Sequence, residues 1–169
     1  MDKKITKNED LAQNRDYLYR KGVGILLINE EKKIFVGKRL DNHSDAWQMP
    51  QGGIDSNENE DKAVFRELQE ETGVKKKFTK IIAKSEEYYY YNLPYRLQKK
   101  FWGGKYLGQK QRWYIMSFHG KDSDININSE DPEFSDWQWF STQEVLTRIV
   151  PFKKNLYQSV LEEFAIHLK

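Results

Sequence analysis

The stretch GGIDSNENEDKAVFRELQEETGV, residues 52–74, decides the fold of this chain. It predicts one helix over about residues 59–72. Asn59 is a favourable N-cap at its start, and Gly73 is a favourable stop at its end. The local sequence therefore fixes both ends of the helix without help from the rest of the chain.

Two different arcs run along this helix, because each residue turns by about 100°. One arc is apolar and is expected to face the core: Val64, Phe65 and Leu68. The neighbouring arc is acidic, since residues at i, i+3 and i+4 share a face: Glu67, Glu70 and Glu71. Like charges so close destabilise a helix, and divalent cations that prefer oxygen ligands would relieve the repulsion. The acidic arc therefore predicts a Mg²⁺ or Mn²⁺ site rather than a solvated helix face.

The spacing of the glycines, acids and arginine in this stretch resembles the sequence box of the Nudix hydrolases at every fixed position. Seven fixed residues would match by chance at roughly 10⁻⁸ per start position. These residues are Gly52, Glu58, Arg66, Glu67, Glu70, Glu71 and Gly73. Arg66 also lies four residues before Glu70 and is expected to pair with it.

Composition narrows the class of protein. The 169 residues suggest one domain, which we place at residues 19–169 after a polar N-terminal extension, residues 1–18. A net charge of +2 gives no reason to expect binding to DNA, and the absence of cysteine excludes disulfides and thiolate zinc sites. No apolar run is long enough for a membrane span, and the N-terminus lacks the apolar segment of a secretory signal. The expectation is a cytoplasmic protein without a membrane partner; its oligomeric state stays open.

Hydrophobic patterns outside the box predict further strands and helices. Strands are expected at residues 22–29, 34–39, 78–85, 87–91, 111–119 and 137–140. Helices are expected at residues 142–149 and 152–169, and loops at residues 41–46, 47–53 and 93–108. His43, in the first of these loops, is expected to face solvent. Strands with helices on both sides predict an α/β layered sandwich, which the Nudix resemblance specifies as an α/β/α sandwich with a mixed sheet and a catalytic loop–helix–loop.

Four segments outside the box resemble the bacterial RNA pyrophosphohydrolases, which are close relatives of the diadenosine tetraphosphate hydrolases. The segments are WQMPQGGI, GQKQRWY, PEFSDWQW and VPFKKNLY, which begin at residues 47, 108, 132 and 150. The similarity covers roughly residues 19–164. This chain departs from the relatives in its longer N-terminus and in HSDAW, residues 43–47, which is two residues longer.

The resemblance implies roles for particular side chains. Glu67, Glu70 and Glu71 correspond to the family's metal-binding and catalytic acids, joined by Glu133 from outside the box. Arg66 belongs to the same catalytic set, and Gly52 to the metal site. Two or more Mg²⁺ or Mn²⁺ ions are implied. The residues expected around the phosphates, base and 5′ end of a substrate are Arg20, Arg39, Tyr91, Phe152 and Lys153.

The implied reaction is metal-dependent hydrolysis of a phosphoanhydride. The first expectation is an RNA 5′-pyrophosphohydrolase that makes 5′-monophosphate RNA and so promotes mRNA decay. One alternative is a dinucleoside polyphosphate hydrolase acting on diadenosine tetraphosphate. A second, of another class, is a Nudix module that binds nucleotides without cleaving them. Residues 75–112 carry eleven Lys or Arg against two Glu, which favours RNA.

Overall fold

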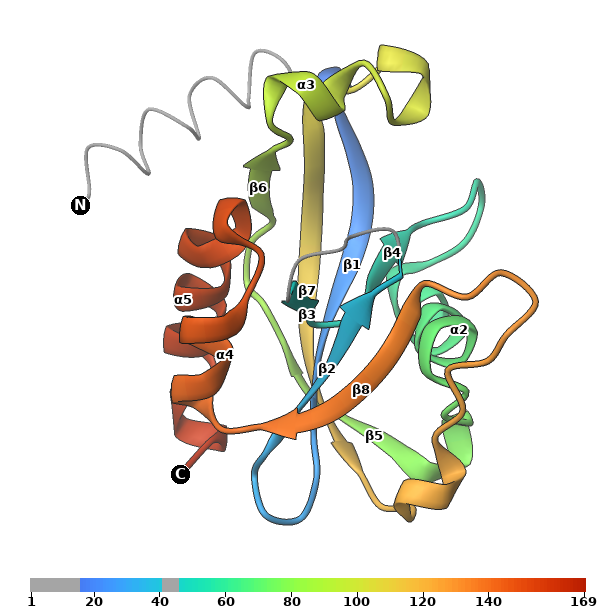
Figure 1. Cartoon of the computed structure of the whole chain (residues 1–169), viewed down its shortest axis with the longest axis vertical. Coiled ribbons are helices and arrows are strands. Elements are labelled where there is room, and N and C mark those ends of the chain that lie inside the picture. Colours follow the sequence, from blue (N-terminus) through green and yellow to red (C-terminus); the bar gives the residue numbers. More distant parts are fainter. Residues whose placement is uncertain (1–15, 41–45) are drawn as a thin grey trace.

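The centre of the fold is a parallel pair of long strands, β1 (Tyr19–Ile28) and β7 (Gly108–Phe118). They stay in register from Tyr19, opposite Gly108, to Ile28, opposite Ser117. We describe a computed structural model of the chain, which covers residues 16–40 and 46–169 (Figure 1). The predicted N-terminal extension up to residue 15, most of the predicted loop at 41–46 and His43 lie outside these ranges.

The other strands extend this pair into one eight-stranded mixed sheet with the main order β3-β2-β1-β7-β5. The main path is completed by β2 (Ile34–Arg39), β3 (Trp47–Gln48) and β5 (Thr79–Lys84). Three strands attach beside it: β4 (Gln51–Gly53) to β1, β6 (Tyr89–Asn92) to β7, and β8 (Phe134–Phe140) to β2. The mixed sheet predicted from the sequence is confirmed.

Helices cover both faces of this sheet (Figure 1). The box helix α2 (Glu60–Thr72) lies on one face, and α4 (Thr142–Arg148) and α5 (Lys154–Glu163) lie on the other. Side chains of β1 alternate between the two cores: Val23, Ile25 and Leu27 pack with α2, whereas Leu26 and Ile28 pack with α4 and α5. This arrangement is the predicted α/β/α sandwich, and it explains why residues 23–28 are all buried.

Local sequence fixes the ends of α2 as expected. The Asn59 side chain accepts a hydrogen bond from the Lys62 backbone N–H, and Gly73 ends the helix with φ of 73°. The left-handed conformation at Gly73 carries no steric cost for glycine. None of the helices in the two described ranges has the length and apolar character needed to cross a lipid bilayer.

Three expectations for local structure were wrong. Residues 47–53 are not a simple loop but form β3 and β4, because Gly22 and Gly52 let the backbones of β1 and β4 approach closely: a Cβ on Gly22 would lie 2.7 Å from the Gly52 carbonyl oxygen. Residues 93–108 contain α3 (Tyr95–Gln98) and the 3-10 turn η3 (Trp102–Gly104).

The C-terminal helix is also shorter than expected. The 3-10 turn η5 (Pro151–Lys153) precedes it, and η6 (Ala165–His167) follows it. The left-handed pair of glycines in η3 and the proline at the start of η5 explain the irregular segments.

Candidate active site

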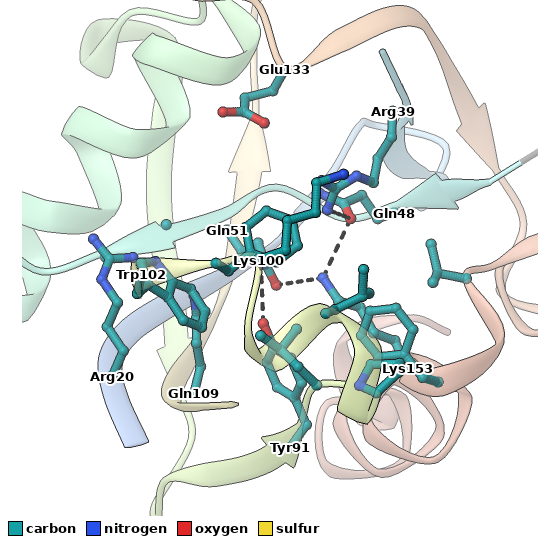
Figure 2. Close-up of a pocket in the computed structure, with 18 of the residues that line it drawn as sticks. Arg20, Arg39, Gln48, Gln51, Tyr91, Lys100, Trp102, Gln109, Glu133 and Lys153 are labelled. Atoms are coloured by element: carbon teal, nitrogen blue, oxygen red, sulfur yellow. Dashed lines mark hydrogen bonds between the residues drawn. The ribbon is translucent and has the colours of Figure 1, made fainter. Parts of the chain in front are cut away.

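A pocket of about 820 Å³ opens where β4, α2, β6 and η5 meet (Figure 2). Ten residues that the sequence predicts for the site line it: Arg20, Arg39, Gly52, Glu67, Glu70, Glu71, Tyr91, Glu133, Phe152 and Lys153. The other three box residues, Glu58, Arg66 and Gly73, are not part of its lining. The pocket therefore gathers positions that lie more than 130 residues apart in the chain.

Arg66 links the acids of the box through hydrogen bonds. Its Nε and Nη2 donate to the two carboxylate oxygens of Glu58 at 2.7 and 2.8 Å, and Nη2 also donates to the Gly53 carbonyl at 2.8 Å. Its Nη1 donates to Glu67 at 2.9 Å and to Glu70 at 3.2 Å. These hydrogen bonds hold the pKa of Glu58 down at about 2 and raise that of Arg66. The predicted pairing of Arg66 with Glu70 is present, but Glu58 is the stronger partner.

The glycine at position 52 makes room for Glu67. A Cβ at this position would lie 1.9 Å from Cδ of Glu67, far inside van der Waals contact. The Glu67 carboxylate can therefore lie this close to the backbone of β4 only if residue 52 is glycine. This contact is the physical reason for one fixed position of the box.

The three acids of the helix differ in how deeply they are buried. The Glu71 side chain is buried and accepts a hydrogen bond from the Gln51 backbone N–H at 3.1 Å. Burial raises its pKa well above the usual value, and the nearby Glu67 adds to this. Burial likewise raises the pKa of Glu67 to about 7, although Arg66 opposes the shift. The side chain of Glu70, by contrast, is 59% exposed and lies toward Arg66.

Glu133 reaches the pocket from the segment before β8. Its backbone carbonyl accepts a hydrogen bond from the Leu40 N–H at 2.9 Å, which ties this segment to the end of β2. Its side chain is exposed and lies at the edge of the pocket in Figure 2. The tertiary fold thus singles out one acid from an acidic stretch that looked uniform in the sequence.

The four glutamates do not form a ready metal-binding group. Within residues 16–40 and 46–169, no three His, Cys, Asp or Glu side chains are placed together as a metal ion would require. Arg66 instead donates to Glu67 and Glu70, and the Gln51 N–H donates to Glu71. The role of these acids in holding a metal ion therefore stays a prediction.

The chemistry of the donors nevertheless fits a hard divalent cation. Four carboxylates line one pocket, and carboxylate oxygens are the ligands that Mg²⁺ and Mn²⁺ prefer. The buried Glu71 accepts from a neutral backbone N–H and is repelled by Glu67 and Glu133. A cation beside it would relieve this repulsion.

Cations also line the pocket. The Lys153 side chain is 1% exposed, and its Nζ donates to the amide oxygens of Gln51 at 2.8 Å and Gln48 at 3.3 Å (Figure 2). Burial lowers the pKa of Lys153 to about 7. Arg39 donates to Gln48 at 3.4 Å, so Gln48 links both cations. These groups can bind phosphate oxygens.

Aromatic side chains and glutamines complete the lining of the pocket. The rings of Tyr91 and Phe152 lie 6.3 Å apart, and Lys153 Nζ lies 5.3 Å from the Tyr91 ring centre. Gln51 donates to the Tyr91 hydroxyl at 3.4 Å and accepts from Gln111 at 3.0 Å. The glutamines were not predicted. Their signal in the sequence was the repetition of Gln beside Pro50 and in GQKQ, which places Gln109 and Gln111 on one face of a strand.

Comparisons with known proteins agree with this geometry. The profile of the NUDIX domain family matches residues 18–160. An RNA pyrophosphohydrolase of Sphingopyxis alaskensis is 51% identical over 146 residues, which are 86% of this chain and 92% of that protein. One of Roseobacter denitrificans is 49% identical over 150 residues, 89% of this chain and 94% of the relative. One of Orientia tsutsugamushi is 45% identical over 168 residues, 99% of both chains.

Solved structures of lower sequence identity share the fold. The dihydroneopterin triphosphate pyrophosphohydrolase of E. coli matches with a TM-score of 0.66 at 15% identity and covers 84% of this chain and 96% of its own. An Ap4A hydrolase of C. elegans matches with a TM-score of 0.59 at 16% identity and covers 85% and 98%. At such identities the likeness concerns the fold alone.

Proposed function

Since the chain belongs to the Nudix family, we propose that it is a metal-dependent pyrophosphohydrolase that converts RNA with a 5′-triphosphate into RNA with a 5′-monophosphate. The relatives at about half identity are RNA pyrophosphohydrolases by name, and they match nearly the whole of this chain. Their names support an enzyme over a module that only binds nucleotides.

One observation carries the proposal. A single pocket is lined by four carboxylates, by buried or partly buried cations and by aromatic rings. A polyphosphate attached to a nucleotide needs both kinds of group: acids that hold divalent cations, and side chains that bind the phosphate oxygens and the base.

Glu67, Glu70, Glu71 and Glu133 are the residues that would hold Mg²⁺ or Mn²⁺ at this site. When bound, such ions neutralise phosphate charge and lower the pKa of a bound water. Gly52 belongs to this set because its missing side chain gives the Glu67 carboxylate its place. Arg66 contributes by orienting Glu67 and Glu70 through Nη1.

The chain itself supplies a proton acceptor and charge stabilisation. Glu67 or Glu71 would accept the proton of the attacking water, because Glu71 is buried and the Glu67 side chain is only 12% exposed, whereas Glu70 lies exposed against Arg66. The water oxygen bonds to phosphorus, and the bridging P–O bond breaks. Arg20, Arg39 and Lys153 would stabilise the negative charge on the phosphate oxygens. The products are 5′-monophosphate RNA with pyrophosphate, or with two phosphates released in turn.

Tyr91 and Phe152 would contact the base at the 5′ end. Both rings lie on the pocket wall near Lys153, and aromatic stacking holds single-stranded bases without requiring a particular sequence. A monophosphorylated 5′ end would favour decay of the mRNA. Because the proposed substrates are transcripts, the proposal includes the predicted cytoplasmic location.

The test compares two substrates at equal concentration. Purified protein with Mg²⁺ is incubated with triphosphorylated RNA and with diadenosine tetraphosphate, and 5′-monophosphate RNA, ATP and AMP are measured. We expect faster turnover of RNA. Faster cleavage of diadenosine tetraphosphate would favour the dinucleoside polyphosphate hydrolase instead. Cleavage of neither, with retained nucleotide binding, would favour the non-catalytic module.

A further inference from the structure

The segment of residues 94–105, which we call the basic arm, forms one rim of the pocket. It contains α3 and η3 and lies above the ends of β1 and β7 (Figure 1). The arm has four cations and no acid: Arg96, Lys99, Lys100 and Lys105. All four are exposed, and none forms an ion pair with an acidic side chain of the described residues. Such a concentration of one sign of charge attracts an anionic partner.

The arm is anchored to the site rather than attached only by its ends. The Arg20 guanidinium lies 5.5 Å from the centre of the Trp102 ring, and Arg20 itself lies against Gly53 of β4. Leu97, Phe101 and Trp102 pack against the core on the α5 side of the sheet. The position of the arm over the pocket is therefore set by partly buried contacts.

The backbone of the arm adopts an uncommon conformation to make this contact. Trp102 has φ of 53°, and Gly103 and Gly104 follow with φ of 63° and 76°. A positive φ is rare for a residue with a large side chain and costs free energy. This strained residue is the one whose indole ring contacts Arg20.

The cations of the arm continue the charge of the pocket outward. Arg96 and Lys100 line the pocket together with Arg20 and Lys153, whereas Lys99 and Lys105 lie on the same arm outside the lining. Figure 2 shows Lys100 over the pocket and Trp102 beside Arg20. The positive charge thus leads from the proposed triphosphate site to the surface.

We propose that the basic arm binds the RNA backbone of the nucleotides that follow the 5′ end. This inference rests on the proposed function, because it takes the 5′ end to lie in the pocket. Arg96 and Lys100 contact the first phosphodiesters at the pocket mouth, and Lys99 and Lys105 contact those further along. Each nucleotide of a single strand brings one phosphate, which basic side chains bind without regard to sequence. The arm thereby selects RNA chains over nucleotides and dinucleoside polyphosphates, which have no following backbone.

The test varies RNA length and charge together. The variant Lys99→Ala/Lys100→Ala/Lys105→Ala is compared with wild type on a triphosphorylated dinucleotide and a triphosphorylated decanucleotide. The matched control, Lys76→Ala/Lys77→Ala/Lys80→Ala, removes three exposed lysines from the far end of the sheet. We expect kcat/KM on the decanucleotide to fall about tenfold or more through KM, at least five times more than on the dinucleotide. For the decanucleotide, the slope of log KM against log salt concentration should be smaller by about 2 in the variant, because three phosphate contacts are lost.

Two results would overturn the inference: equal losses on both lengths, or a loss no greater than that of the control. The proposed function is judged separately, by whether wild type cleaves either RNA at all. If it cleaves neither, binding of a 5′-hydroxyl decanucleotide decides the role of the arm. Weaker binding by the arm variant than by wild type and control would support the inference, and equal binding would overturn it.

Discussion

The guanidinium of Arg66 forms a two-point ion pair with the carboxylate of Glu58, with N–O distances of 2.7 and 2.8 Å. Neither residue lines the pocket, yet the same guanidinium also holds Glu67 and Glu70. The pair therefore joins the stability of the box to the arrangement of its acids. Loss of Glu58 should loosen both.

The first prediction concerns Glu58→Gln and acid stability. The hydrogen bonds from Arg66 lower the pKa of Glu58 from 4.5 to about 2 in the folded state. Their stabilisation is therefore complete above pH 4.5 and is lost as the pH falls toward 2. At pH 7 the variant should lose about 1–3 kcal/mol of unfolding free energy.

Urea unfolding between pH 2 and pH 7 measures this effect. The difference between wild type and variant should shrink as the pH falls through the window from 4.5 to 2. Glu31→Gln is the control. The Glu31 side chain is 76% exposed, and its Oε2 lies 3.8 Å from Lys33 Nζ, so it forms only a weak ion pair. A difference that stays constant over the whole range would contradict the assignment.

The second prediction concerns Glu71→Gln. Burial and the neighbouring Glu67 make an ionised carboxylate costly at this position, so the variant without metal should be at least as stable as wild type at pH 8. Mn²⁺ should raise the Tm of wild type more than that of the variant, because it binds the folded state of wild type more tightly. Turnover of triphosphorylated RNA should fall about 10²–10⁴-fold.

Differential scanning fluorimetry without MnCl₂ measures the stability of each protein, and the same measurement with MnCl₂ gives the increase in Tm on metal binding. Glu162→Gln, an exposed acid on α5, serves as the control and should behave as wild type in every measurement. Full turnover by a folded Glu71→Gln protein would remove Glu71 from the site.

The third prediction concerns Gly52→Ala. The new Cβ would lie 1.9 Å from Cδ of Glu67, so the carboxylate must move. A displacement of about 1 Å at a reacting group costs roughly 10²-fold in rate. Because both changes act on one side chain, Gly52→Ala combined with Glu67→Gln should cost little more than Glu67→Gln alone. Multiplicative losses in this double-mutant cycle of kcat/KM would show that Gly52 acts in another way.

Local rules explain why so much of the box could be predicted. Asn59 and Gly73 end α2 through backbone geometry that depends on neighbouring residues only. The continuous apolar run in β1 similarly predicts a buried strand, and the structure shows its residues 22–28 all buried. The resemblance added residues such as Glu133 and Lys153, which no local pattern distinguishes from other acids and lysines.

Tertiary contacts explain what could not be predicted. The sequence places Glu67, Glu70 and Glu71 on one arc, but the hydrogen bond that Glu71 accepts from the Gln51 N–H of β4 depends on the tertiary fold. The strand character of residues 51–53 depends on close approach to Gly22. The anchoring of the basic arm depends on contact between Trp102 and Arg20, which are 82 positions apart.

The last prediction concerns Lys153→Met. Burial lowers the pKa of Lys153 from 10.5 to about 7 in the folded state, so the unfolded chain binds more protons between these values. Wild type should therefore gain stability as the pH rises from 7 to 10.5, whereas this gain should be absent from the variant.

Below pH 7 the wild-type fold carries the whole cost of a buried charge, which is up to roughly 5 kcal/mol for such a shift. The hydrogen bonds that Gln48 and Gln51 lose in the variant offset part of this, so we expect the variant to be about 1–3 kcal/mol more stable at pH 6.5. Affinity for triphosphorylated RNA should fall in the same protein, because a phosphate-binding cation is gone. Guanidinium unfolding at pH 6.5 and pH 9.5 with Lys154→Met, an exposed neighbour, as control measures the stability change. A variant that is less stable than wild type at both pH values would mean that Lys153 supports the fold rather than the binding of phosphate.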